Sequence, residues 1–235
     1  MRLLLLLRHA VTEHTGARLS GWMPGLHLSE AGREQAKGLA ERLGPVPLDA
    51  VYASPLERCQ ETAAAVADAK GLKLQTLEDL GEVRYGDWTG RALKELAREP
   101  LWKVVQATPS AARFPEGESL YEMQARAVLA VERLREAHPR QTVAVCSHAD
   151  VIKALACHYL GMHLDLFLLD QQGDLVGPGG GLEVEGALAG LADGVGGQPG
   201  DRVQVTAGHG PPPAACGAGG APWAAGPGRR CRRCR

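Results

Sequence analysis

The chain opens with five consecutive leucines, Leu3 to Leu7, followed directly by Arg8 and His9. A short apolar run of this kind is typical of a β-strand that is covered on both faces. In open α/β sheets, ligands collect beyond the carboxyl ends of such strands. We therefore expect His9 to face a ligand with Arg8 beside it, although an Arg-His pair is as often the ordinary start of a polar loop.

A second apolar segment, Asp49 to Ala53, predicts another strand, and Ser54-Pro55 behind it predicts the start of a helix. This helix would carry Arg58 in its opening turns. Free backbone N–H groups at a helix start attract anions, and a guanidinium can hold two phosphate oxygens. Taken alone, Arg58 would be interpreted as a solvated surface arginine.

A third strand is predicted over residues 142–147, and it ends at Ser147-His148 ahead of an apolar helix over residues 151–160. His148 therefore occupies the same kind of strand exit as His9. Three separate strand-to-helix connections thus bring two histidines and two arginines to one edge of the sheet. Together these four residues indicate an anion site more strongly than any one of them does alone.

The hydrophobic pattern up to residue 167 alternates strands with helices, and it predicts an α/β fold: a three-layer α/β/α sandwich with a mostly parallel central sheet. The other expected elements are a helix from Ser29 with Ala36, Leu39, Ala40 and Leu43 on one face, a short strand within Leu72 to Leu77, helical material over Lys94 to Gln106, and a helix that a Ser119–Glu122 capping box begins and that runs towards His138. Trp102, inside the helical material, is expected to be a core residue rather than part of a pocket.

A glycine-punctuated loop, Leu80 to Gly90, adds a carboxylate at Glu82. On its own Glu82 could be an ordinary loop residue. It matters only together with the other segments.

Four segments in order resemble the histidine phosphatase superfamily, which includes the cofactor-dependent phosphoglycerate mutases. They are Arg8-His9-Ala10-Val11-Thr12, the S-x-x-x-R-x-x-x-T stretch from Ser54 to Thr62, Glu82 ahead of Gly86-Asp87-Trp88-Thr89-Gly90, and Ser147-His148. The resemblance runs from Met1 to about Phe167. It implies the phosphoglycerate mutase-like fold.

The resemblance also implies the roles of five residues: His9 as the nucleophile that accepts the phosphoryl group, Arg8, Arg58 and His148 as the phosphate pocket, and Glu82 as the proton donor. Such chemistry needs no metal and no cofactor. A neutral imidazole is a good nucleophile, and the two arginines, with His148 if it is protonated, would stabilise the charge on the transferred phosphoryl group.

The chain departs from the family pattern at two positions. Ala10 stands where glycine is most common, and Thr15 stands where many members have an asparagine that touches the phosphate. An added methyl is tolerated if the backbone of Ala10 keeps a negative φ. We keep Thr15 as an expected phosphate-binding residue.

Composition limits the kinds of partner. The chain has 235 residues, is 45% hydrophobic and carries a formal net charge of −1, which argues against nucleic-acid and anionic-membrane binding. The leucine run is far shorter than the about 20 apolar residues of a membrane span, and no signal-peptide cleavage pattern follows it. We expect a cytoplasmic protein whose partner is a small phosphomonoester, and the sequence gives no indication of oligomeric state.

The cysteines do not predict a disulfide framework or a metal centre. Cys59, Cys146 and Cys157 have no paired spacing, and Cys146 lies on an apolar strand, as a buried thiol would. Cys231 and Cys234 have the spacing of zinc ligands, but two ligands alone do not make a structural site.

The composition changes beyond residue 167. Eighteen of the 30 glycines and seven of the 15 prolines lie between Gln171 and Arg235, which predicts a largely disordered segment over residues 168–235. Weak strand candidates remain at Leu182 to Val184 and at Val203 to Thr206. If neither forms a strand, the domain over residues 1–167 would lack its last strands. Out-of-frame translation after Phe167 would produce this composition, a hypothesis that the intact mass of the natively expressed protein tests.

Three functions fit these observations: a phosphomonoesterase that uses His9, a phosphomutase with the same chemistry, and a catalytically silent binder of phosphate ligands. The resemblance implies that mutases acting on phosphoglycerate carry a longer insert with extra arginines. Here the corresponding segment, Trp88 to Phe114, is short and holds only Arg91, Arg98 and Arg113. The sequence therefore favours the phosphatase.

Overall fold

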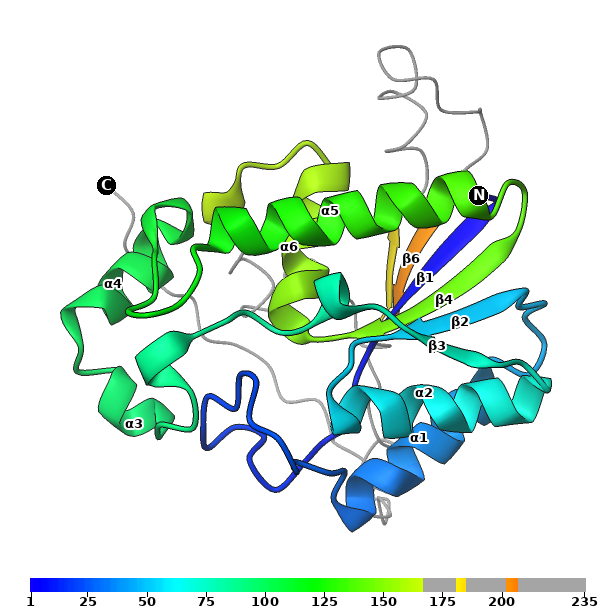
Figure 1. Ribbon diagram of the computed structural model, residues 1–235, viewed down its shortest axis with the longest axis horizontal. Coiled ribbons are helices and arrows are strands. Elements are labelled where there is room, and N and C mark those ends of the chain that lie inside the picture. The colour runs from blue at the N-terminus through cyan, green and yellow to red at the C-terminus, as the bar shows by residue number, and fades with distance from the viewer. Residues whose placement is uncertain (167–180, 185–201, 207–235) are drawn as a thin grey trace, which may run out of the picture.

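A computed structural model describes residues 1–166, 181–184 and 202–206. Its centre is a six-stranded sheet in the order β3-β2-β4-β1-β6-β5 (Figure 1). All neighbouring strands are parallel except β5, which runs antiparallel to β6. The strands are β1 (Leu3–Arg8), β2 (Ala50–Ala53), β3 (Leu74–Thr76), β4 (Thr142–Ser147), β5 (Gly181–Val184) and β6 (Arg202–Thr206).

The leucine run of β1 is covered on both faces, as its sequence predicts. Leu4 and Leu6 belong to one core with residues of α5 (Leu120–Ala137) and α6 (Ala149–Tyr159), whereas Leu5 and Leu7 belong to a second core with residues of α1 (Glu30–Arg42) and α2 (Glu57–Lys70). Each of the four side chains is at most 2% exposed. The period of two along the strand thus produces three layers, with α1 and α2 on one face of the sheet and α5 on the other (Figure 1).

Local capping explains where two of these helices begin. The Ser29 side chain accepts a hydrogen bond from the N–H of Gly32 at the start of α1. Ser119 and Glu122 form the predicted capping box at the start of α5. Both helix starts are therefore confirmed.

The start of α2 differs from the prediction. The helix begins at Glu57, with Leu56 rather than Ser54 in the N-cap position. The Ser54 hydroxyl cannot cap the helix two residues on because it lies against the buried imidazole of His148 instead, at 2.8 Å. It still accepts the N–H of Leu56, at 3.3 Å, so the turn between β2 and α2 is closed by the same side chain.

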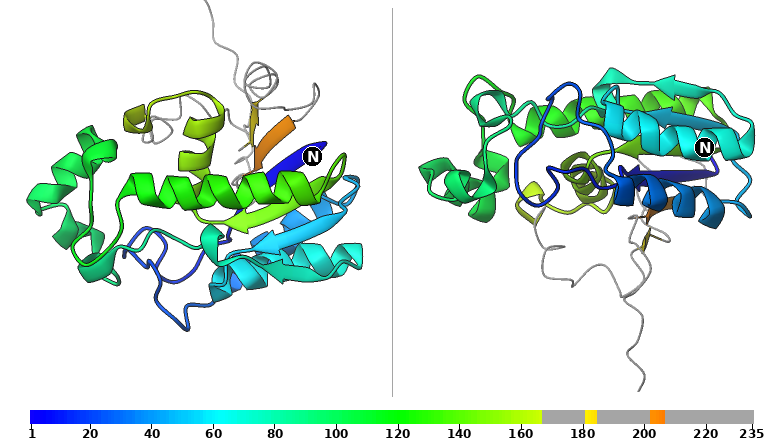
Figure 2. Two further views of the ribbon diagram at one scale, coloured as in Figure 1. Left: turned by 45° about the horizontal axis from the view of Figure 1, so that its top comes forward. Right: turned by 90° about the horizontal axis from the view of Figure 1, so that it is seen from below.

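Two short helices, α3 (Leu93–Leu96) and α4 (Pro100–Ala107), lie beyond the carboxyl ends of the strands (Figure 2). Backbone hydrogen bonds tie this region to the loop that follows β1, since Leu93 N–H donates to the carbonyl of Ala17 and Leu19 N–H to that of Arg91. Trp102 of α4 packs against the core and stacks on Trp88, with ring centroids 6.2 Å apart. The predicted helical material and the core role of Trp102 are confirmed.

Short 3-10 helices complete the connections: η1 (Glu78–Leu80), η2 (Gly86–Trp88), η3 (Pro109–Ala111) and η4 (Leu164–Leu166).

The two weak strand candidates of the C-terminal segment are both strands. β6 pairs with β1 from Leu3↔Arg202 to Leu7↔Thr206, and β5 pairs with β6. The remainder of residues 168–235 lies outside the described residues. The predicted disorder, the reading-frame hypothesis and the Cys231–Cys234 pair concern that remainder and stay predictions.

Cys59, Cys146 and Cys157 are free, buried thiols, as expected for the part of the chain that the structure describes. Among the described helices, none has the length and apolar character needed to span a membrane.

Candidate active site

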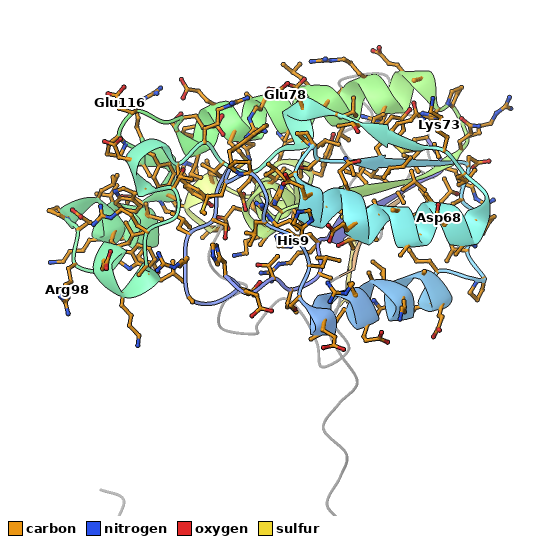
Figure 3. All side chains as sticks on the ribbon, turned by 60° about the horizontal axis from the view of Figure 1, so that its bottom comes forward. His9, Asp68, Lys73, Glu78, Arg98 and Glu116 are labelled. Atoms are coloured by element: carbon orange, nitrogen blue, oxygen red, sulfur yellow. The ribbon has the colours of Figure 1, made fainter. Side chains whose placement is uncertain are left out.

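The two histidines meet because their strands are neighbours. β1 and β4 pair in register up to Arg8↔Ser147, so the next residue of each strand leaves the same edge of the sheet. The N–H of His9 continues the ladder by donating to the carbonyl of Ser147, at 3.0 Å. The ring centroids of His9 and His148 are 5.2 Å apart (His9 is labelled in Figure 3). This convergence was predicted from the two strand exits.

His9 is held with one ring nitrogen free. Its Nδ1 lies 2.8 Å from the carbonyl of Ala10, which can only accept, so Nδ1 carries the proton. Burial, followed by the Arg58 guanidinium, lowers the pKa of His9 from 6.5 to about 3. The ring is therefore neutral near pH 7, and Nε2 carries a lone pair that could attack an electrophile.

Arg58 is a buried cation with an unused donor. Its side chain is 2% exposed, and Nη2 donates to the carbonyl of Gly21 at 2.8 Å and to Nδ1 of His148 at 3.2 Å. Nη1 is buried and has no hydrogen-bond partner among the described residues. Buried polar atoms are rarely left unpaired, and a buried charge even more rarely. The free Nη1 of Arg58 therefore points to an anionic ligand.

His148 is fully buried and neutral. Because its Nδ1 accepts from Arg58, its proton lies on Nε2, which donates to Ser54 Oγ. Burial, followed by repulsion from the protonated form of His9 and from the Arg58 guanidinium, lowers the pKa of His148 well below 6.5. The ring of His148 is therefore neutral in this arrangement, and the positive charge of the site resides on the arginines.

Glu82 lies beside His148, with its Oε2 3.7 Å from Nδ1 of His148. Its side chain is 12% exposed, and Oε1 accepts the N–H of Val83 at 3.0 Å. Burial, followed by the nearby carboxylate of Asp150, raises the pKa of Glu82 from 4.5 to about 7. A carboxyl with this pKa can hold a proton near neutral pH and give it up, as a general acid requires.

Arg8 and Thr15 are less closely involved. Arg8 is exposed at the end of β1, its side chain makes no hydrogen bond with another described residue, and its charge contributes to lowering the pKa of His9. The Oγ1 of Thr15 accepts the N–H of Thr12 at 2.9 Å and so closes a turn of the loop behind His9. Within the described chain, no hydrogen bond joins Thr15 to the other expected site residues.

The substitution at Ala10 is accommodated. Ala10 has a negative φ, since Glu116 and Arg140 are the two non-glycine residues of the described chain with positive φ. Its N–H donates to Oγ1 of Thr62 at 3.0 Å. Ala10 therefore holds the loop after β1 without strain.

Three further residues shape the site, and no sequence motif indicates their roles. Ser54 binds His148 rather than capping a helix, Asp150 raises the pKa of Glu82, and Arg126 of α5 binds the backbone that carries Glu82. All three act across long sequence separations. The strand exit at His148 indicates that Asp150 lies near the site, but it does not reveal the electrostatic effect of Asp150 on Glu82.

The described residues hold no group of three or more histidine, cysteine, aspartate or glutamate side chains arranged to hold a metal ion. The arrangement consists instead of a neutral imidazole nucleophile, a buried guanidinium with a free donor and a carboxyl with a raised pKa. Such a set can transfer a phosphoryl group.

Comparison with known families agrees with this geometry. Residues 4–174 match the model of the histidine phosphatase superfamily (branch 1). Among curated proteins, the chain is 35% identical to phosphoserine phosphatase 1 of Hydrogenobacter thermophilus over 167 residues, which cover 70% of this chain and 79% of that protein. It is 31% identical over 169 residues to the adenosylcobalamin/alpha-ribazole phosphatase of Escherichia coli, covering 68% of this chain and 79% of the relative.

Among solved structures, mycobacterial glucosyl-3-phosphoglycerate phosphatase has the same fold, with a TM-score of 0.64 and 27% sequence identity. The superposition covers 69% of this chain and 81% of that one. The predicted three-layer, phosphoglycerate mutase-like architecture is thus confirmed.

Proposed function

Because this chain belongs to the histidine phosphatase superfamily, we propose that it hydrolyses a small phosphomonoester through a phosphohistidine intermediate on His9. One observation carries the proposal: the buried, unpartnered Nη1 of Arg58 lies in the same cluster as a neutral imidazole. The three relatives described above are named as phosphatases of three different small phosphorylated compounds, which supports the reaction and leaves the substrate open.

In the first step, Nε2 of His9 attacks phosphorus, the P–N bond forms and the bond to the leaving oxygen breaks. Arg58 and Arg8 stabilise the negative charge on the equatorial phosphoryl oxygens. Glu82 donates its proton to the leaving alkoxide. His148 keeps the Arg58 guanidinium in place through their hydrogen bond.

In the second step, Glu82 is ionised and removes a proton from water, which attacks the phosphohistidine. The P–N bond breaks, inorganic phosphate leaves and His9 returns to its neutral state. A bound dianionic phosphate would favour the protonated form of both histidines, so their pKa values should rise while the ligand is present.

We expect kcat/KM for an alkyl phosphate to fall tenfold per pH unit above about pH 7. The first step needs Glu82 protonated, a state lost above its pKa of about 7, and His9 neutral, a state held down to its pKa of about 3. The check is a pH profile of wild type and Glu82→Gln on the same substrate. The glutamine cannot ionise, so the fall above pH 7 should disappear in the variant; a fall of unchanged size would exclude Glu82 as its source.

The mutase alternative is weakened by the arginines between Trp88 and Phe114. Arg91 is paired with Glu99 at 2.7 Å, and Arg113 is paired with Glu122. Arg98 lies at the outer end of the molecule, away from His9 (Figure 3). None of the three is therefore poised to bind the carboxylate of a phosphoglycerate.

The deciding experiment measures phosphate release from p-nitrophenyl phosphate, with and without EDTA, beside isomer exchange of phosphoglycerate with added bisphosphoglycerate. A phosphatase releases phosphate at a rate that the chelator leaves unchanged. Exchange faster than release would establish a mutase, and phosphate binding without release or exchange would establish a silent binder. A screen over phosphorylated metabolites would then identify the substrate.

A further inference from the structure

The backbone that carries Glu82 is bound by a single side chain from another layer of the fold. Arg126, on α5, donates from Nη1 to the carbonyls of Asp79 and Gly81, both at 2.8 Å, and from Nη2 to the carbonyl of Glu82 at 2.8 Å. Glu78, at the start of this segment, lies beside α5 in Figure 3. Three carbonyls within four residues thus point at one guanidinium.

Arg126 is itself fixed in orientation. Its Nε donates to Oε2 of Glu118 at 3.0 Å, and Nη2 donates to Oε1 of the same carboxylate at 2.6 Å. With the three carbonyl bonds, all five N–H groups of Arg126 are used. The pair is largely buried, with side-chain exposures of 16% for Arg126 and 11% for Glu118. Because the planar guanidinium of Arg126 is hydrogen-bonded on both edges, the backbone of residues 79–82 that it binds has little freedom to shift.

Two more side chains bind the same segment. Oγ of Ser147, the last residue of β4, donates to the carbonyl of Leu80 at 2.7 Å. Nε1 of Trp22 donates to the carbonyl of Glu82. All four backbone carbonyls from Asp79 to Glu82 therefore accept hydrogen bonds from side chains. The side chain of Glu82, which this backbone carries, lies with its carboxyl 3.7 Å from His148.

We propose that Arg126 is a positioning residue for Glu82, holding residues 79–82 so that the carboxyl stays buried against His148. Arg126 makes no bond to the carboxyl group itself and acts only through the backbone. The inference rests on the proposed function, in which Glu82 is the proton donor. Proton transfer needs the donor within hydrogen-bond reach of the leaving oxygen, so a loosened segment should cost rate wherever protonation limits the reaction.

The direction of the Glu82 pKa in a variant separates positioning from a direct charge effect. Burial and Asp150 raise this pKa to about 7, Arg58 and Arg126 lower it, and the neutral ring of His148 lies 3.7 Å away. Removing only the charge of Arg126, with the segment still in place, would raise the Glu82 pKa further. Releasing the segment into water would lower the pKa towards its ordinary 4.5.

The test is a carbon-13 NMR titration of labelled glutamate carboxyls in the full chain, assigned to Glu82 by its loss in Glu82→Gln. In Arg126→Gln we expect the titration of Glu82 to move from about pH 7 down by one unit or more. Arg133→Gln is the matched control: Arg133 lies on the same helix, is 66% exposed, and forms an ion pair with the side chain of Asp79, at 3.3 Å, rather than with the backbone of the segment. This control should leave the Glu82 pKa unchanged.

Kinetics supply the second readout. The relevant quantity is the ratio of the rate for an alkyl phosphate to the rate for p-nitrophenyl phosphate. This ratio should fall at least tenfold in Arg126→Gln, in the same direction as in Glu82→Gln. The double variant should show no further fall in the ratio. A side chain that only stabilises the fold would slow both substrates equally. If Arg126→Gln does not fold, Arg126→Lys keeps the charge but cannot reach three carbonyls, and the same two readouts apply to it.

An unchanged or raised Glu82 pKa in folded Arg126→Gln or Arg126→Lys would overturn the positioning role. An unchanged substrate ratio in the same variants would overturn it as well. A wild-type protein that neither turns over p-nitrophenyl phosphate nor forms phosphohistidine would instead overturn the proposed function. In that case the titration alone would decide whether Arg126 holds the Glu82 carboxyl in place.

Discussion

Replacing His9 with alanine is expected to abolish both phosphate release and the covalent phosphoenzyme. The neutral Nε2 of His9 is the nucleophile of the proposed reaction, and no other ring nitrogen of the cluster is free, because both nitrogens of His148 are occupied by Arg58 and Ser54. Losing a nucleophile commonly costs several orders of magnitude in rate. Water bound beside Arg58 could attack in its place only far more slowly.

The measurement is a rapid, acid-free quench after mixing with substrate, followed by peptide mapping. Wild type should carry an acid-labile, base-stable phosphoryl group on His9, and His9→Ala should carry none. His158→Ala, at an exposed position on α6, is the control and should behave as wild type. Full activity in His9→Ala, or an adduct mapped elsewhere, would contradict the mechanism.

Arg58→Ala is expected to lower kcat/KM by about 10² to 10³, and to do so equally for alkyl and aryl phosphates. The reason is the free Nη1: it is a preorganised donor in a buried site, where a charge stabilises the transition state far more than in water. The loss should not depend on the leaving group because, in the proposed reaction, Arg58 stabilises the phosphoryl group rather than the leaving oxygen. Steady-state kinetics on both substrate types measure it.

Two companion variants sharpen this result. Arg58→Lys keeps the charge but cannot bind Gly21, His148 and a phosphate oxygen together, so its activity should lie between those of wild type and Arg58→Ala. Arg42→Ala, at an exposed position in the last turn of α1, should change nothing. Losses in Arg58→Ala that are restricted to alkyl phosphates would assign Arg58 to the leaving group instead.

Much of the fold could be predicted from the sequence because its signals are local. The leucine run of β1, the apolar residues of β4 and the capping box of α5 each specify one element from a few neighbouring residues. The convergence of His9 and His148 followed from these elements, since parallel strands end at a common edge. The sequence alone therefore predicts the proposed nucleophile and the strand ends that surround it.

What the sequence did not reveal depends on contacts between distant segments. The local sequence predicts that Ser54 caps α2. Its hydroxyl instead binds the buried imidazole of His148, which lies 94 positions further along the chain. The neutrality of His148 follows from burial and from neighbouring cations, which no motif records. The five bonds of Arg126 connect α5 to residues 79–82 and 118, and a helical arginine with such partners looks like any other in a sequence.

The position of β1 between β4 and β6 affects the order in which the molecule can fold. β1 precedes the other described strands in the chain, but its hydrogen-bonding partners are Thr142 to Ser147 on one edge and Arg202 to Thr206 on the other. Both pairings are among the most remote in the chain, and remote pairings form slowly because a long loop must close first. The five leucines that end in His9 must therefore remain unpaired until both partner strands have been synthesised, and an unpaired apolar strand is prone to aggregation during that time.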